Sequence, residues 1–260
     1  MYQKFFRLIY MSCILVFIPL LVNAELSTRD AWDNLKKLLE TGGYQVIGQE
    51  IIVGPDLSIK NVQISSEVDA QTDITFDIGS LDLTKNKDGF IKISLPDEIY
   101  VQYLIEDEFG YKTEANILVR ARELDLKVSG KLSQVLYQLT ASSAGFALVE
   151  LLDNGVVSSD LSAEMEFVLA DVNSTIRVAG VSTIEVTSLF SASGASVKGG
   201  LSLLSVPLKL NFQYVMDQLK SSSVSKEPKV SLDEDFELAL TEGFSSTSNF
   251  TFDTSEMSLN

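Results

Sequence analysis

The alternation of apolar and polar residues after residue 43 constrains the fold of this chain more than any other feature. Apolar side chains recur at every second position through most of residues 44–216, and the longest such run is Val206, Leu208, Leu210, Phe212 and Tyr214. This period is typical of half-buried antiparallel strands, with one face on the core and the other in water. The sequence therefore predicts a mainly β fold: an extended antiparallel meander over residues 44–216, forming a curved sheet, a roll or a sandwich.

Turn signals divide these runs at the spacing expected of a meander. Asp88-Gly89 and Asn154-Gly155 are dipeptides that tolerate positive φ and favour tight hairpins. Gly54-Pro55-Asp56 and Phe109-Gly110 mark two further reversals. Between Ile59 and Val62 the alternation slips by one residue, which predicts a bulge near Lys60-Asn61.

One helix is predicted before the strands, within residues 25–43. Ser27 with Asp30 forms a capping box in which Asp replaces the usual Glu. Gly42-Gly43 is a natural end signal. The single tryptophan, Trp32, lies on the apolar stripe and is predicted to be a core residue; the stripe continues with Leu35, Leu38 and Leu39.

A second boundary is predicted near the end of the chain. Residues 217–229 are rich in serine and contain Pro228, which favours a linker. Alternation resumes in residues 230–260, with Phe236, Leu238 and Leu240. We therefore expect a second β segment to begin at residue 230, and to be truncated if Asn260 is not the natural end of the protein.

Residues 1–24 have the layout of a cleaved secretory signal peptide. Lys4 and Arg7 precede an apolar run from Leu8 to Leu21, and cleavage is predicted between Ala24 and Glu25. A membrane anchor is the alternative, but the run is shorter than the roughly 20 residues of a spanning helix. No transmembrane helix is expected in the mature chain. The periplasm of a Gram-negative bacterium is the predicted location.

Composition excludes several classes of function. The chain contains no histidine and one cysteine, Cys13, which lies inside the predicted signal. Catalysis through histidine or cysteine, thiolate or histidine metal sites and disulfides are therefore not expected in the mature chain. Removing Lys4 and Arg7 leaves 18 basic against 36 acidic residues, a net charge of −18. This charge disfavours binding to nucleic acid.

The remaining candidate sites are better explained as structure. Glu106-Asp107-Glu108 and Asp233-Glu234-Asp235 are acidic clusters, but adjacent strand residues point to opposite faces, unlike a catalytic carboxylate pair. Thr84 to Gly89 resembles part of a calcium loop, yet it lacks the first Asp and the final Glu. Ser222 and Ser223 near Lys226 lie in the predicted linker. We predict no catalytic, metal or cofactor-binding residue, and no enzymatic activity.

The long apolar sheet face carries the functional prediction. A one-sided sheet with a single helix must bury that face against itself, a partner or an apolar ligand. We expect a periplasmic protein that binds a lipid-like ligand or an envelope partner. Two alternatives remain open: part of an outer-membrane β-barrel, or a structural envelope protein without a ligand.

The order of the amino-terminal motifs resembles a known family. Ala31-Trp32-Asp33-Asn34-Leu35 begins the helix, Gly43-Tyr44-Gln45-Val46 begins the first strand, and residues 86–96 form an N-x-D-G…L-P hairpin. Together they resemble the exported bacterial family called domain of unknown function 2125, most clearly over residues 20–150. The resemblance implies an exported protein with a sheet-rich fold, a chain longer than this one, and no site residues.

Overall fold

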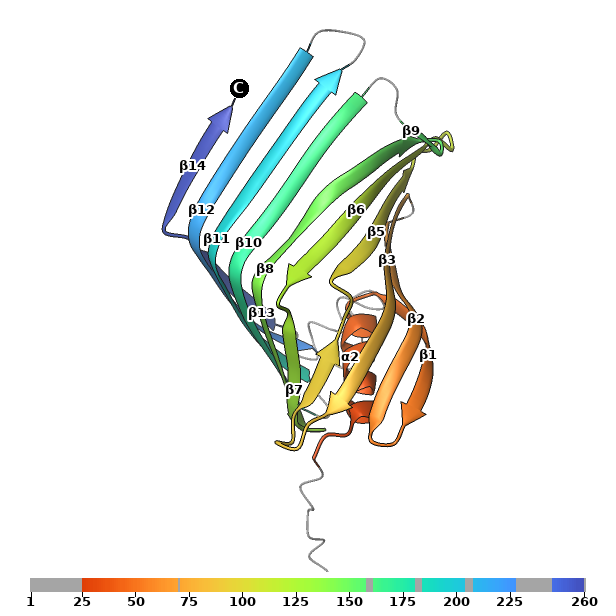
Figure 1. Cartoon of the computed structure of the whole chain (residues 1–260), viewed down its shortest axis with the longest axis vertical. Helices are drawn as coiled ribbons and strands as arrows, with labels where there is room; N and C mark the ends of the chain where they lie inside the picture. Colours follow the sequence, from red (N-terminus) through yellow and green to blue (C-terminus); the bar gives the residue numbers. More distant parts are fainter. Residues whose placement is uncertain are drawn as a thin grey trace, which may run out of the picture.

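The computed structural model of the protein describes residues 25–69, 71–157, 161–180, 184–203, 208–227 and 245–259. These residues form one α-helix and one antiparallel sheet of fourteen strands, so the predicted mainly β fold class is confirmed (Figure 1). The elements are α2 (Thr28–Thr41), β1 (Gln45–Val53), β2 (Asp56–Asp69), β3 (Thr72–Lys85), β4 (Ile91–Ser94), β5 (Glu98–Glu106), β6 (Lys112–Arg122), β7 (Asp125–Lys131), β8 (Gln134–Asp153), β9 (Val156–Val157), β10 (Leu161–Ala179), β11 (Ile184–Leu203), β12 (Leu208–Glu227), β13 (Ser245–Thr251) and β14 (Thr254–Leu259).

The strands follow the order β1-β2-β3-β4-β7-β8-β10-β11-β12-β13 across the sheet. Three pairs of shorter strands each occupy the place of one long strand. β4 and β5 both pair with β3, β6 and β7 both pair with β8, and β13 and β14 both pair with β12. The sheet thus has two parts along the direction of its strands, each with its own set of short strands.

A transverse row of residues separates these two parts, and we call it the crease. The register places Ser142, Asp171, Ser193 and Gln218 opposite one another on β8, β10, β11 and β12. Asp171 and Gln218 have φ of 46° and 55°, in the left-handed region. Ser193 Oγ donates to Asp171 Oδ2 over 2.7 Å, which ties neighbouring strands together at the kink. The long strands bend at this level (Figure 1).

The crease changes the phase of the alternation without changing the register. On β10 the core-facing residues have odd numbers before Asp171, as at Phe167 in the distal direction, and even numbers after it, as at Val178 near the helix. Residues from both sides of the crease nevertheless pack in one cluster, because Ala192 and Leu219 meet Ala195. On β10 and β12, the left-handed residue therefore keeps the apolar side chains of the strand on one side of the sheet.

The helix-side part of the sheet holds the main core. It consists of β1, β4, β7, β13 and the adjoining ends of β2 and of the long strands, and the sheet curves round α2 there (Figure 1). Trp32 is 3% exposed in this core, so its prediction as a core residue is confirmed. The most deeply buried strand side chains of the cluster are Leu57, Ile59, Val62, Leu83, Ile91, Ile93, Val128 and Val135.

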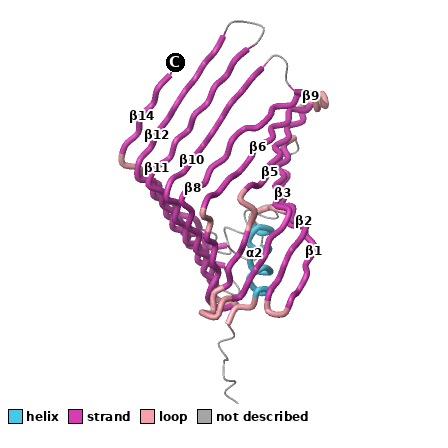
Figure 2. Tube along the Cα trace, viewed as in Figure 1, coloured by secondary structure: helices cyan, strands magenta, loops and turns pink. Residues whose placement is uncertain are grey.

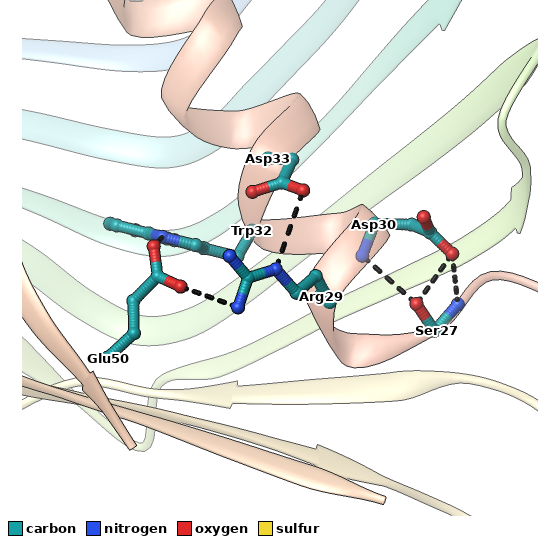
Figure 3. Close-up of polar contacts among 6 residues, drawn as sticks. All are labelled: Ser27, Arg29, Asp30, Trp32, Asp33 and Glu50. Atoms are coloured by element: carbon teal, nitrogen blue, oxygen red, sulfur yellow. Dashed lines mark hydrogen bonds and ion pairs between the residues drawn. The ribbon is translucent and has the colours of Figure 1, made fainter. Parts of the chain in front are cut away.

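The helix begins and ends where the sequence predicts. Ser27 Oγ accepts from the Asp30 backbone N–H, and the Asp30 carboxylate accepts from the Ser27 N–H, each over 3.1 Å (Figure 3). Gly43 follows with φ of 83°. Trp32 Nε1 donates to Glu50 Oε1 over 3.0 Å, which joins the helix to β1. Tyr137 Oη donates to Asn34 Oδ1 over 2.8 Å and joins the helix to β8.

The predicted turns and the bulge are confirmed. Asp88-Gly89 closes the β3–β4 hairpin, Asn154-Gly155 the β8–β9 hairpin and Gly54-Pro55 the β1–β2 hairpin. The pairing of β2 with β3 shifts between Lys60 and Val62, and Asn61 has φ of 52°.

The prediction of a linker over residues 217–229 is wrong for residues 217–227. Residues 217–227 belong to β12, which runs unbroken to Glu227, while residues 228 and 229 lie outside the described residues. The serines there are held in the sheet by pairing on both sides, and Ser223 is hydrogen-bonded to Ser188 across the strands. In the predicted second segment, 230–260, Phe236, Leu238 and Leu240 are also outside the described residues. Its strands β13 and β14 join the same sheet through β12.

Candidate functional site: an uncovered apolar sheet face

The second part of the sheet, beyond the crease, carries the candidate site. We call it the distal part: it consists of β5, β6, β9, β14 and the ends of the long strands that adjoin them. One row of directly paired residues crosses seven of its strands on the side that faces the core. This apolar row is Ile99, Val119, Phe146, Phe167, Val197, Tyr214 and Met257.

The apolar row contains no charged side chain, whereas the opposite face of the same strands does. Shifting each strand by one residue gives a second row on the other face, with Glu98, Arg120 and Glu256 among its members. At strand spacings of about 4.8 Å, the apolar row is about 29 Å wide. That width exceeds one leaflet of the roughly 30 Å hydrocarbon core of a bilayer, which is the reach of an acyl chain.

Neighbouring positions on the same face extend the apolar surface along the strands. Three large side chains at these positions are exposed: Met165 is 38%, Leu201 40% and Leu210 39% exposed. Other members of the surface, at least partly buried, are Val101, Tyr103, Ile117, Leu148, Leu169, Phe212 and Met216. The surface is therefore continuous and partly open to solvent.

Close packing of aromatic rings flattens this surface. The rings of Phe146 and Phe167 on β8 and β10 lie 5.3 Å apart between centroids. Gly199 lies opposite Phe212, and a Cβ atom at Gly199 would come within 2.3 Å of the Phe212 ring. The absence of a side chain at Gly199 thus lets the ring of Phe212 lie across β11.

No described element covers the apolar row. The one helix of the described residues, α2, lies at the other end of the sheet against β1, β2 and β3 (Figure 2). Only Ile99, at the β5 end of the row, packs against the core around the helix. The apolar side of the sheet is therefore filled by a helix in one part and left uncovered by the described residues in the other.

A cluster of polar side chains between α2 and the sheet has a structural role. Arg29 Nη1 lies 2.8 Å from Glu50 Oε2, and the other oxygen of Glu50 accepts from Trp32 (Figure 3). Burial raises the pKa of the Tyr137 phenol above its ordinary value of 10.0, because the protein interior disfavours its charged form. These groups join the helix to the sheet, and none of them lies in the apolar row.

The other sites considered from the sequence lie in turns and strands. Glu106-Asp107-Glu108 spans the end of β5 and the turn to β6, and Thr84 to Gly89 runs from β3 into its hairpin turn. Ser222, Ser223 and Lys226 lie on β12. Among the described ranges, no group of acidic, histidine or cysteine side chains is arranged to hold a metal ion.

Two further predicted positions lie at or beyond the limits of the described chain. Asp233-Glu234-Asp235 is outside the described residues, as is Ala24 of the predicted cleavage site. Glu25 is the other residue of that cleavage site, and its Oε2 lies 3.1 Å from Lys85 Nζ. In the part of the chain that the structure describes, no helix has the length and apolar character needed to span a bilayer.

Comparisons with known proteins identify no relative. No family model matches the chain, and neither a curated protein nor a solved structure is significantly similar to it. The resemblance to domain of unknown function 2125 therefore stays a prediction.

Proposed function

We propose that this protein is an exported, non-enzymatic protein of the Gram-negative periplasm that binds the acyl chains of lipids on the apolar face of its distal part. The observation that carries the proposal is the apolar row: seven paired side chains on seven strands, without a charge and without a covering element in the described chain. An uncovered apolar surface of this extent is unfavourable in water and favours an apolar ligand.

The distribution of charge supports a lipid over a polar ligand. Charged residues of the distal strands, such as Glu166 and Lys198, are paired on the opposite face. A hydrocarbon chain needs no polar partner, and each methylene that it buries contributes about 0.8 kcal/mol. The face therefore offers binding energy without specific hydrogen bonds.

The direct test is native mass spectrometry of the protein released from the periplasm, followed by extraction and identification of bound lipid. We expect one or more acyl-chain ligands to copurify, and a fluorescent fatty acid to bind to the delipidated protein. Release of the protein with periplasmic contents on fractionation tests the location in the same preparation. Protein that carries no lipid and does not bind the fatty acid contradicts the proposal.

A matched pair of variants locates the ligand on one face of the sheet. Val197→Glu introduces a charge in the apolar row, and Ser196→Glu introduces the same charge one residue away on the opposite face. We expect Val197→Glu to lose fatty-acid binding and Ser196→Glu to keep it. Trp32 fluorescence reports folding of the helix-side core in both variants, because Trp32 is buried there.

Leu210→Glu provides a second variant on the apolar face, with less risk to folding. Leu210 is 39% exposed, so its replacement disturbs less packing than a change at Val197. Its control is Asn211→Glu, the next residue along β12, whose side chain points to the other face. Equal binding by Leu210→Glu and Asn211→Glu contradicts the assignment of the ligand to the apolar face.

A further inference from the structure

Two hairpin turns meet at the end of the distal part that lies away from α2 (Figure 1). One is the β5–β6 turn and the other is the β8–β9 turn. The Lys112 N–H donates to Asn154 Oδ1 over 2.9 Å, and the Asn154 N–H donates to the Lys112 carbonyl over 2.7 Å. These two hydrogen bonds hold the turns together as one unit.

Large apolar side chains project from this unit into solvent. Phe109 is 87% exposed, Tyr111 45%, Val156 69% and Val157 59%. We call these four residues the distal tips. Phe109 is the most exposed of the large apolar side chains that the structure describes.

The β5–β6 turn is held in a defined conformation. Asp107 Oδ1 accepts from the N–H groups of Phe109 over 2.8 Å and Tyr111 over 2.9 Å. The Gly110 N–H donates to the Asp107 carbonyl over 3.0 Å, and Gly110 has φ of 80°, a conformation that suits glycine. The carboxylate of Asp107 thus fixes the backbone on which Phe109 projects.

The small size of the distal tips favours a lipid surface over a protein partner. A specific protein interface covers about 800 Å² on each side, whereas one aromatic side chain supplies 150–250 Å² at full burial. Four side chains on two turns do not reach that area. Insertion into a bilayer interface needs only a few apolar side chains, and Phe and Tyr suit the boundary between headgroups and hydrocarbon.

Charge selects the kind of lipid surface. Glu106 Oε2 lies 3.1 Å from Lys112 Nζ, so these two charges offset one another. Glu108 adds a negative charge beside Phe109. The net negative charge of the chain acts in the same direction and repels anionic headgroups.

We propose that the distal tips insert into the surface of a zwitterionic lipid bilayer and so bring the end of the apolar face to a source of acyl chains. This inference rests on the proposed function, because it names the bilayer as the place where that ligand is taken up or released. Ile105, 39% exposed on the same face as the apolar row, lies next to the tips at the end of β5.

Flotation with phosphatidylcholine vesicles tests the inference, using Phe109→Ser combined with Val156→Ser. The control is Leu132→Ser, because Leu132 is also an apolar turn residue, 63% exposed, in the β7–β8 turn of the helix-side part. We expect the double variant to bind vesicles about tenfold or more weakly than the wild type, and the control to bind normally. Equal binding by the wild type and the double variant overturns the inference, as does equal weakening by the control.

Two further measurements separate this inference from the proposed function. Binding of a fluorescent fatty acid in solution should be unchanged in the double variant, because the tips lie outside the apolar row; loss of vesicle binding alone then identifies the tips. In Phe109→Trp, we expect the emission to shift to the blue with phosphatidylcholine vesicles, against the constant signal of buried Trp32. An unshifted emission overturns insertion. Phosphatidylglycerol vesicles test the lipid charge. If the wild type prefers them to phosphatidylcholine vesicles, and Glu108→Lys does not bind them more tightly than the wild type, the assignment of lipid charge is overturned.

Discussion

The helix-side and distal parts of the sheet share their long strands but bury their apolar face in different ways. In the helix-side part, Ile59, Val128 and Val135 are fully buried around α2. In the distal part, Phe146, Phe167 and Tyr214 on the same side of the sheet are only half-buried. Strands of the same alternating pattern thus form a core where a helix covers them and a candidate binding surface where none is described. The comparison shows that alternation specifies a sheet, whereas the covering element decides what the apolar face does.

The largest expected effect comes from emptying the core under the helix. Trp32→Ala removes a side chain that is 3% exposed and leaves a cavity, so it should lower the free energy of unfolding by about 3–5 kcal/mol. Leu210→Ala, in the distal part, should lower it by about 1 kcal/mol or less because Leu210 is already 39% exposed. Urea denaturation measures both. Equal losses would break the comparison between the two parts.

The crease provides the next test, since it connects the two parts. Gln218→Val places a β-branched residue at φ of 55° and should cost about 1–2 kcal/mol. Gln218→Gly removes the steric penalty and should leave the free energy of unfolding unchanged or slightly higher. Thermal and urea denaturation of the two variants give the comparison. If valine is tolerated as well as glycine, the left-handed backbone at Gln218 is not required.

Tyr137→Phe tests the polar link between the helix and β8. Loss of the hydrogen bond to Asn34 should cost about 1 kcal/mol at neutral pH. Burial raises the pKa of Tyr137 in the folded state, so the unfolded chain releases the phenol proton first as the pH rises above 10.0. The stability contributed by the neutral phenol is therefore present below that pH and is lost above it.

Urea titrations of the wild type and Tyr137→Phe at a series of alkaline pH values measure this effect. Above pH 10, the free energy of unfolding of the wild type should fall more steeply than that of Tyr137→Phe, by up to about 1.4 kcal/mol per pH unit. Parallel pH profiles of the two proteins would show that the Tyr137 phenol titrates alike in the folded and unfolded states.

The smallest effect is expected at the exposed ion pair beside Trp32. Arg29 is half-exposed, so Arg29→Ala should cost less than about 1 kcal/mol even though its Nη1 lies 2.8 Å from Glu50. Lys36→Ala, which removes an exposed helix pair with Glu40, is the control for loss of a surface charge. A loss at Arg29 well above that of the control would show that the helix depends on this ion pair as well as on its apolar contacts.

Local features of the fold could be predicted because they depend on neighbouring residues. The capping box at Ser27, the turns at Asp88-Gly89 and Asn154-Gly155 and the slip near Asn61 all follow from side-chain and backbone preferences within a few positions. The serines of residues 221–225 favour a loop in the sequence because serine is common in loops, whereas their strand pairing with β11 and β13 is a tertiary effect.

The sequence predicts the candidate site only as an apolar sheet face that must be buried against something. The crease explains why its extent could not be read from the sequence. Along the chain, the apolar positions of β10 change from odd to even at Asp171, and those of β12 change from even to odd at Gln218. In the sequence, two runs of alternation with different phases indicate two separate strands or a strand and a linker. The signal that could have found the crease is this phase change itself, at an Asp in one strand and a Gln in the next but one.

The order of the strands has a consequence for how the protein assembles. β1, β2 and β3 pair in succession, as do β10, β11 and β12, so most strands join a neighbour that precedes them directly in the chain. Contacts between sequence neighbours close short loops and favour stepwise growth. A chain that enters a compartment from its amino terminus can therefore form the helix and its first hairpins early and then lengthen the sheet one hairpin at a time. At most stages the newest strand is the template for the next, and where it is not, as at β10, an earlier strand takes that place.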